Sequence, residues 1–158
     1  QSLVIDKAET TESLTDKLAK LGGQLIVQTI KDIVVGKIEP IEQDSSLVTY
    51  VKKLTKADGL IDWTREAVYL ERFVRAMSPW PSAWTWMSGR QLKILAISEI
   101  IELDTYKPGK VFVYNNQLAI QTGKGAVIVS RLQAEGKRPM SSQEFVNGYS
   151  EIVGVVLA

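Results

Sequence analysis

The side chains of this sequence that could take part in chemistry are carboxylates, lysines and arginines, because the chain contains neither histidine nor cysteine. Imidazole is the usual general base near neutral pH and the commonest metal ligand. The absence of both side chains excludes Ser-His and Cys-His catalysis and most zinc sites; a carboxylate pair or an activated lysine stays open. The acids Asp62, Glu66 and Glu71 lie near a helix start and beside cations, where capping and ion pairing explain them. We therefore expect no catalytic residue and no metal site in this chain.

The lysines and arginines are distributed unevenly, although the net charge is only +1. Residues 107 to 138 hold six cations against one acid, a local balance of +5, whereas the first 36 residues hold four lysines against five acids. Such an asymmetry is expected of a protein that binds a nucleic acid. A solvated basic face would explain the same pattern, so charge alone leaves both interpretations open.

Three short stretches place cations where they could contact phosphate groups. The stretch "TGKGA" lacks the spacing of a phosphate-binding loop and is typical of a β-hairpin tip, from which Lys124 would project. The stretch "EGKRP" puts Lys137 and Arg138 on an exposed turn. Cations on such turns suit phosphate contacts, which give affinity without reading sequence. The third cluster, which could also serve only to keep a linker solvated, consists of Lys52, Lys53 and Lys56.

Three tryptophans, Trp80, Trp84 and Trp86, allow two interpretations. Tryptophan buries a large apolar area, so packing between a helix and a sheet is the interpretation we favour. The alternative is a platform on which nucleobases stack, as in proteins that bind single strands. Trp84 and Trp86 would face the same side of a strand, whereas Trp80, held between two prolines, is expected to plug a corner.

The first two segments that position these residues are a helix and a linker. Thr10 or Thr11 can cap a helix whose leucines and isoleucines recur at helical spacing, and Gly36 suits its C-terminal end. One amphipathic helix cannot bury its own apolar stripe, so it is expected to pack on a larger domain or on the later segments of the chain. Residues 37–58 are mixed in charge and non-periodic, which predicts an extended linker.

The third segment, residues 59–158, is predicted to be rich in strands after one helix. Thr64 is the candidate helix cap, and Pro79 stops the helix. Five strand candidates come after this helix, with a tight Asn115–Asn116 turn among them and a capping box, "SSQE", before a short last helix. The candidates are "AWTWM", "QLKILAIS", "KVFVY", "LAIQT" and "AVIVSRL". We therefore predict a mainly β fold with helices, an OB-like five-stranded barrel preceded by an amphipathic helix and an extended linker.

Several motifs occur in one order along nearly the whole chain: "ETTESLTDKLAKLG", "EPIEQD", "LVTYVKKLTKADGLIDW", "LERFVRAMSPWPSAW", "LAIQTGKGA" and "EGKRPMSSQEF". In these motifs the sequence resembles the C-terminal part of the bacterial methionyl-tRNA formyltransferases. The resemblance implies a parent enzyme that moves a formyl group from 10-formyltetrahydrofolate to the methionine of initiator tRNA in translation initiation. It also implies that the catalytic triad and the folate site lie before this chain begins, so that the chain itself holds no cofactor.

The resemblance also divides the chain. Residues 1–36 would be the tail of the catalytic domain, 37–58 the linker, and 59–158 the OB-like domain that helps to hold the tRNA. The implied partners are initiator tRNA and the missing catalytic domain, not a membrane, and the implied compartment is the cytoplasm. No apolar run approaches the roughly 20 residues of a membrane span.

The resemblance implies tRNA contacts for these cations, although they match the family's residues to different degrees. The lysines of 52–56 match the family's basic linker, and Lys137 and Arg138 match a basic turn. Lys124 stands where the family often has an acid, and Gly148 and Tyr149 stand where it often has arginines. The alternative is an interdomain or oligomerisation module of a formyltetrahydrofolate-using enzyme with a non-RNA substrate.

Overall fold

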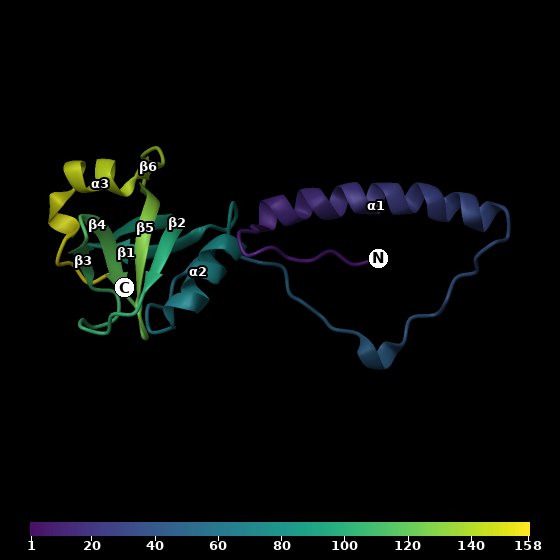
Figure 1. Cartoon of the computed structure of the whole chain (residues 1–158), viewed down its shortest axis with the longest axis horizontal. Helices are drawn as coiled ribbons and strands as arrows, with labels where there is room; N and C mark the ends of the chain where they lie inside the picture. Colours follow the sequence, from purple (N-terminus) through teal and green to yellow (C-terminus); the bar gives the residue numbers. More distant parts are fainter. The chain divides into compact units, whose positions relative to one another are not determined.

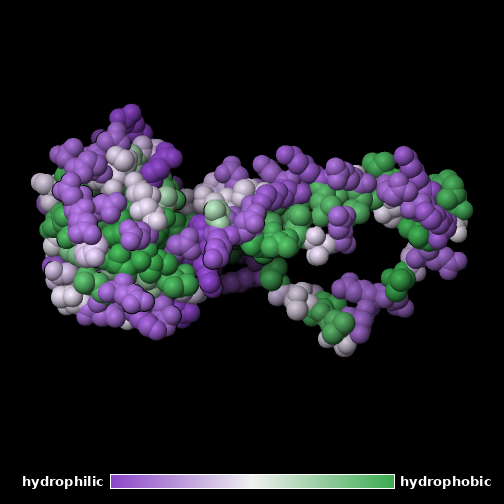
Figure 2. All heavy atoms as spheres, in the orientation of Figure 1, coloured by the Kyte–Doolittle hydropathy of each residue, from purple (hydrophilic) through white to green (hydrophobic).

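The structure is a computed structural model that describes all 158 residues, and they divide into two compact units, residues 1–54 and 55–158. In the first unit, helix α1 spans Thr11–Val34 and begins with a capping box between Thr10 and Ser13. The predicted cap is thus confirmed at Thr10. α1 buries none of its residues, and Figure 2 shows hydrophobic residues exposed on its surface. Between α1 and the second unit, the chain forms only the short 3-10 helix η1 at Ser45–Leu47.

The second unit opens with two helical elements. The 3-10 helix η2 spans Lys56–Gly59, and α2 spans Ala67–Ala76. The predicted cap at Thr64 is wrong, because the Thr64 hydroxyl and amide both donate to Asp62 Oδ1, at 2.6 and 3.0 Å, in a turn before the helix. The first helical amide, that of Ala67, donates instead to the Lys124 carbonyl at 3.0 Å. α2 is therefore attached at its start to the turn between two strands.

The strands form one antiparallel sheet with the order β1-β2-β5-β4-β3, and β6 pairs with β5 at Arg131 and Leu132, beyond the residues that pair with β4. The Asn115–Asn116 turn between β3 and β4 is confirmed, with both residues at positive φ. The final helix α3, Ser142–Gly148, carries the predicted capping box at Ser141 and Glu144. Figure 1 shows α2 and α3 on opposite sides of the strands. The strands are β1 Ala83–Met87, β2 Arg90–Ile101, β3 Val111–Tyr114, β4 Gln117–Gln121, β5 Ala126–Ala134 and β6 Met140–Ser141.

The sheet differs from the predicted five-stranded barrel. It has six strands, no hydrogen-bonded ladder joins the outer strands β1 and β3, and the chain as a whole is mixed α/β. The C-terminal tail, residues 154–158, lies along both outer strands. Gly154 and Val155 exchange backbone hydrogen bonds with Val111 of β3, and Ala158 exchanges two with Trp86 of β1. A short apolar tail without periodicity gives no sequence signal for such pairing.

The main core is formed by residues of 55–158 alone. The inner residues of the sheet, such as Leu92 and Leu132, pack with Leu70 and Val74 of α2 and with Phe145 of α3. Register shifts between Ile94 and Glu99 bend β2 where it crosses β5. No helix of the chain combines the length and the apolar composition that crossing a membrane requires.

Candidate nucleic-acid interface

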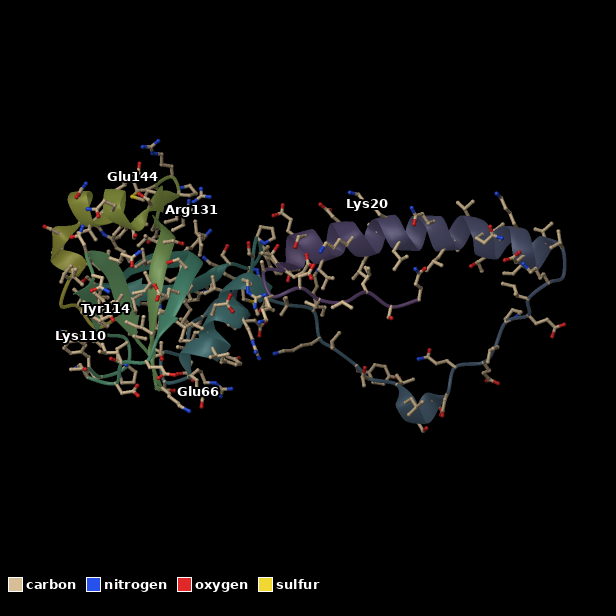
Figure 3. All side chains as sticks on the ribbon, in the orientation of Figure 1. Lys20, Glu66, Lys110, Tyr114, Arg131 and Glu144 are labelled. Atoms are coloured by element: carbon tan, nitrogen blue, oxygen red, sulfur yellow. The ribbon has the colours of Figure 1, made fainter.

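The cations predicted on two hairpin turns lie at opposite ends of β5. Lys124 lies in the turn before β5 and pairs through its backbone with Glu66, whereas Lys137 and Arg138 lie in the turn after it. Nine strand residues separate these turns, a span of roughly 30 Å at about 3.3 Å per residue. Figure 3 shows Glu66 near one end of the sheet and Arg131 and Glu144 near the other. The structure therefore does not bring Lys124 together with Lys137 and Arg138.

The lysines of the linker fall in different units. Lys52 and Lys53 are exposed and lie in the first unit, in a stretch without regular structure. Lys56 begins η2 in the second unit, and its carbonyl accepts a hydrogen bond from Trp84 Nε1 at 2.9 Å. η2 packs closely here: a Cβ on Gly59 would lie 2.1 Å from the Ser82 carbonyl oxygen, so only glycine fits. Lys56 is thereby held beside the outer side of β1.

Three cations that the sequence did not single out as phosphate contacts, Arg90, Lys93 and Arg131, lie on β2 and β5. Along β2, Leu92 and Ile94 are buried in the core, so Lys93 between them points to the outer side of the sheet. On β5, Arg131 and Gln133 alternate with the buried Leu132 in the same way. The register places Lys93 directly opposite Gln133. The alternation was visible in the sequence, but only the pairing of β2 with β5 brings these side chains together.

Lys93 and Arg131 line a groove along the outer side of β2 and β5, and Arg90, which alternates to the side of Leu92, lies at the end of this groove. Three shallow hollows of about 380, 140 and 370 Å³ share lining residues: Gln91 belongs to the first and second, and Lys93 and Gln133 belong to the second and third. We call this surface the β2–β5 groove. Its charged lining residues are Arg90, Lys93, Arg131 and Lys137, with Glu135 and Glu151 as the acids.

The acids of the β2–β5 groove lie at one end of it. One carboxylate oxygen of Glu135, Oε2, accepts a hydrogen bond from the backbone N–H of Gln91 at 3.3 Å. Glu151 lines only the first hollow, so the third hollow holds Lys93 and Arg131 with no acid. The groove therefore combines cations with side-chain amides, a surface suited to a polyanion that also offers hydrogen-bonding groups.

The turn after β5 is attached to the β2–β5 groove. Gln133 Nε2 donates to the Lys137 carbonyl at 2.6 Å, which holds the turn against the groove lining. Arg138 lies 3.9 Å from Glu144, but both side chains are mostly exposed, so this pair is weak. Hydrogen bonds from the Ser141 amide and hydroxyl hold the pKa of Glu144 below its ordinary value, and the nearby charges of Arg138 and Arg131 lower it further.

The prediction that the three tryptophans pack between a helix and the sheet is only partly confirmed. Trp84 is 8% exposed, as expected of a packing residue, but Trp86 is 44% exposed. Trp80 is 55% exposed and does not plug a corner. Trp84 and Trp86 do share a face, with their rings 5.3 Å apart in a T-shaped arrangement. That face is the outer one, because Trp84 is paired with Lys93 and Trp86 with Gln91.

Of the three carboxylates expected to cap or form ion pairs, Asp62 and Glu71 do so, whereas Glu66 stands at the N-cap of α2 without a side-chain cap hydrogen bond. Asp62 accepts both Thr64 hydrogen bonds, and these lower the pKa of Asp62. Glu71 forms an ion pair with Arg75, one turn further along α2. Arg75 donates from Nε to Glu71 Oε1 and from Nη2 to Glu71 Oε2, the latter at 3.0 Å. Every buried side-chain nitrogen or oxygen has a hydrogen-bond partner within the chain, so no buried polar group lacks a partner that a folate would have to supply.

Comparison with known sequences relates this chain to one family of proteins. A family model described as the formyl transferase C-terminal domain matches residues 53–150. The methionyl-tRNA formyltransferase of Lachnospira eligens is 39% identical over 164 residues, which cover 99% of this chain and 52% of that protein. The methionyl-tRNA formyltransferase of Agathobacter rectalis is 39% identical over 141 residues, which cover 89% of this chain and 46% of that protein. The chain thus spans about half the length of these relatives.

Solved structures of HypX from Aquifex aeolicus share the fold. One variant superposes with a TM-score of 0.67 at 16% identity, over 94% of this chain and 28% of that one. HypX in complex with tetrahydrofolic acid gives 0.61 at 19% identity, over 82% and 23%. Identities this low show the fold alone, whereas the sequence relatives and the family model define the relationship. The chain belongs to the family of formyl transferase C-terminal domains and is related to the C-terminal part of the methionyl-tRNA formyltransferases.

Proposed function

We propose that this chain is the tRNA-holding part of an enzyme that formylates methionyl-tRNA, and that the β2–β5 groove contacts tRNA phosphates. The observation that carries the proposal is the groove itself, in which Lys93 and Arg131 face one side of two paired strands and Arg90 and Lys137 line its end. Phosphate contacts need exposed cations at spacings that match a nucleic-acid backbone, and they supply affinity independent of sequence. The 39% identity to methionyl-tRNA formyltransferases supports RNA as the polyanion.

The six cations predicted from the sequence enter this proposal at four places. Lys137 and Arg138 extend the β2–β5 groove at its turn, and Lys56 adds a cation beside β1. Lys52 and Lys53 would contact the tRNA from the linker, 37–58. Lys124, at the other end of β5, would contact a separate phosphate.

The parent enzyme, on this proposal, uses 10-formyltetrahydrofolate as the formyl donor, acts on initiator tRNA in translation initiation and works in the cytoplasm. Residues 1–36 complete its catalytic domain, and residues 59–158 form an OB-like domain. The folate and the reacting groups belong to the half of the parent that this chain does not span, so this chain orients the tRNA and transfers nothing itself. Its contribution is binding energy that places the acceptor end near that half.

The experiment is a titration of the whole chain with labelled initiator tRNA, and in parallel with an elongator tRNA, at two salt concentrations. We expect affinity to fall steeply with salt, because each neutralised phosphate adds about 0.9 to the slope of log affinity against log salt. Lys93→Glu combined with Arg131→Glu should reduce that slope by about 2, near one per cation. Lys20→Glu with Lys31→Glu on α1 is the charge-matched control and should change little.

The linker lysines are tested separately by Lys52→Glu with Lys53→Glu. Weaker binding by a folded double variant would support their contact with tRNA, and unchanged affinity would remove them from the interface. Similar affinity for both tRNAs would place discrimination in the rest of the parent. No binding of either tRNA at low salt would contradict the proposal and favour an interdomain module of a formyltransferase with a non-RNA substrate.

A further inference from the structure

We infer that Trp86 is a stacking platform for one unpaired nucleobase, beside the cations that hold the RNA backbone; this inference rests on the proposed RNA-binding function. Trp86 lies in β1 and is 44% exposed, although a strand of this sheet offers a buried inner side to large apolar residues. A half-exposed indole leaves apolar area in water that a flat ligand would cover.

Trp86 is held in place on both its backbone and its ring. Its amide donates to the Ala158 carbonyl at 2.8 Å, and its carbonyl accepts from the Ala158 amide at 3.2 Å. Its ring contacts Trp84 at 5.3 Å, and Trp84 is fixed by the hydrogen bond from its Nε1 to the Lys56 carbonyl. Less conformational entropy is therefore lost when a base stacks on Trp86 than on a mobile side chain.

The neighbours of Trp86 carry the groups that a nucleotide would need. Gln91 is directly opposite on β2, so its side chain is about 5 Å away at the Cβ atoms. Its amide offers a donor and an acceptor for the edge of a base. Lys93 is two residues further along the same face, and Arg90 lies at the start of β2. A stacked base on Trp86 would thus have its phosphate beside Lys93, which lies on the same face.

An unpaired nucleotide fits this surface better than an apolar peptide. The β2–β5 groove that adjoins Trp86 holds four cations against two acids and contains side-chain amides at Gln91 and Gln133. An apolar peptide would leave these cations without partners, whereas a nucleic acid offers a planar ring and anionic groups in regular alternation. Stacking on an aromatic side chain tolerates any base, because every base has a π-face.

The test compares two labelled ligands of equal charge: eight-nucleotide oligoadenylate and an eight-unit abasic phosphodiester chain. We expect the whole chain to bind oligoadenylate about tenfold more tightly than the abasic chain, the scale of one stacked base. Trp86→Ala should abolish this preference and leave the affinity for the abasic chain unchanged. Trp86→Phe should keep most of the preference. Tyr106→Ala is the control, because Tyr106 is 45% exposed and lies beyond the other end of β2.

The outcomes separate stacking from backbone binding. Lys93→Glu with Arg131→Glu should weaken binding of both ligands equally. If Trp86→Ala keeps the preference while the charge variants lose affinity, the stacking inference falls and the proposed function stands. If the unaltered chain binds tRNA but neither short ligand at low salt, the stacking inference alone falls; if it binds none of them, both fall. Should Trp86→Ala unfold, Trp86→Leu keeps apolar volume without a π-face, and loss of the preference in that variant would decide for stacking.

Discussion

Thr85 is a single side chain that joins three parts of the second unit. Its hydroxyl accepts a hydrogen bond from Trp63 Nε1 at 3.0 Å and donates to the Ala158 carbonyl at 2.8 Å. Thr85 is fully buried, so neither of these partners could find water in its place. One hydroxyl therefore connects the segment before α2, the strand β1 and the C-terminal tail.

Thr85→Val should destabilise the chain by about 1–3 kcal/mol, because valine keeps the shape but leaves the buried Trp63 N–H without an acceptor. Urea unfolding monitored by tryptophan fluorescence would measure the change in free energy of unfolding. Thr85→Ser keeps the hydroxyl and is the matched control, with a smaller expected loss. A valine variant as stable as the serine variant would show that the hydrogen bonds contribute nothing net.

The candidate site shows why residue types were predictable and their grouping was not. Lys137 and Arg138 could be placed on an exposed turn because "EGKRP" has the composition of a turn. Lys93 could not be grouped with Arg131, because the distance between them depends on the register of β2 against β5, across several shifts. The exposure of Trp86 likewise depends on which side of the sheet the helices cover.

Helix α3 begins with a cap that is sensitive to pH. Glu144 accepts hydrogen bonds from the Ser141 amide at 2.8 Å and hydroxyl at 2.9 Å, and these hold its pKa below the ordinary value. A carboxylate with a lowered folded-state pKa stabilises the fold fully above its unfolded pKa of about 4.3 and loses this contribution as the pH falls through its folded pKa. The cap directly precedes Phe145, which is completely buried in the core.

Glu144→Gln should therefore lower the free energy of unfolding at neutral pH, and the difference from the unaltered chain should shrink below about pH 4. Urea unfolding at pH 7, 5 and 3.5 would measure it. Arg138→Ala is a useful comparison, because Arg138 contributes less to the lowered pKa than Ser141 does. A difference that stayed constant to pH 3.5 would mean that the charge of Glu144 plays no part in the cap.

The elements were predictable where a local pattern encodes them. The strand "AWTWM" corresponds to β1 residue for residue, and the Asn115–Asn116 turn and the helix caps at Thr10 and Ser141 result from short-range hydrogen bonding. The two-residue strand β6 and the pairing of the tail with both outer strands are long-range contacts with no local signal. They explain why the strands were predicted and their closure was not.

The two compact units, residues 1–54 and 55–158, should unfold independently of each other. All residues of the two hydrophobic clusters come from 55–158, and α1 buries none of its own. All four tryptophans also lie in 55–158, so their fluorescence reports on that unit alone. A chain of residues 55–158 should unfold within about 0.5 kcal/mol of the full chain, as independent parts do.

Circular dichroism tests whether the two units unfold independently. A helix with no packed face is marginal in water, so the helical signal from α1 should fade gradually and at lower urea than the tryptophan transition. Phe145→Ala, introduced into both chains, should shift the tryptophan transition equally and leave the α1 signal unchanged. If residues 55–158 alone unfolded at clearly lower urea, residues 1–54 would have to contribute to the stability of the sheet, and the independence of the two units would be wrong.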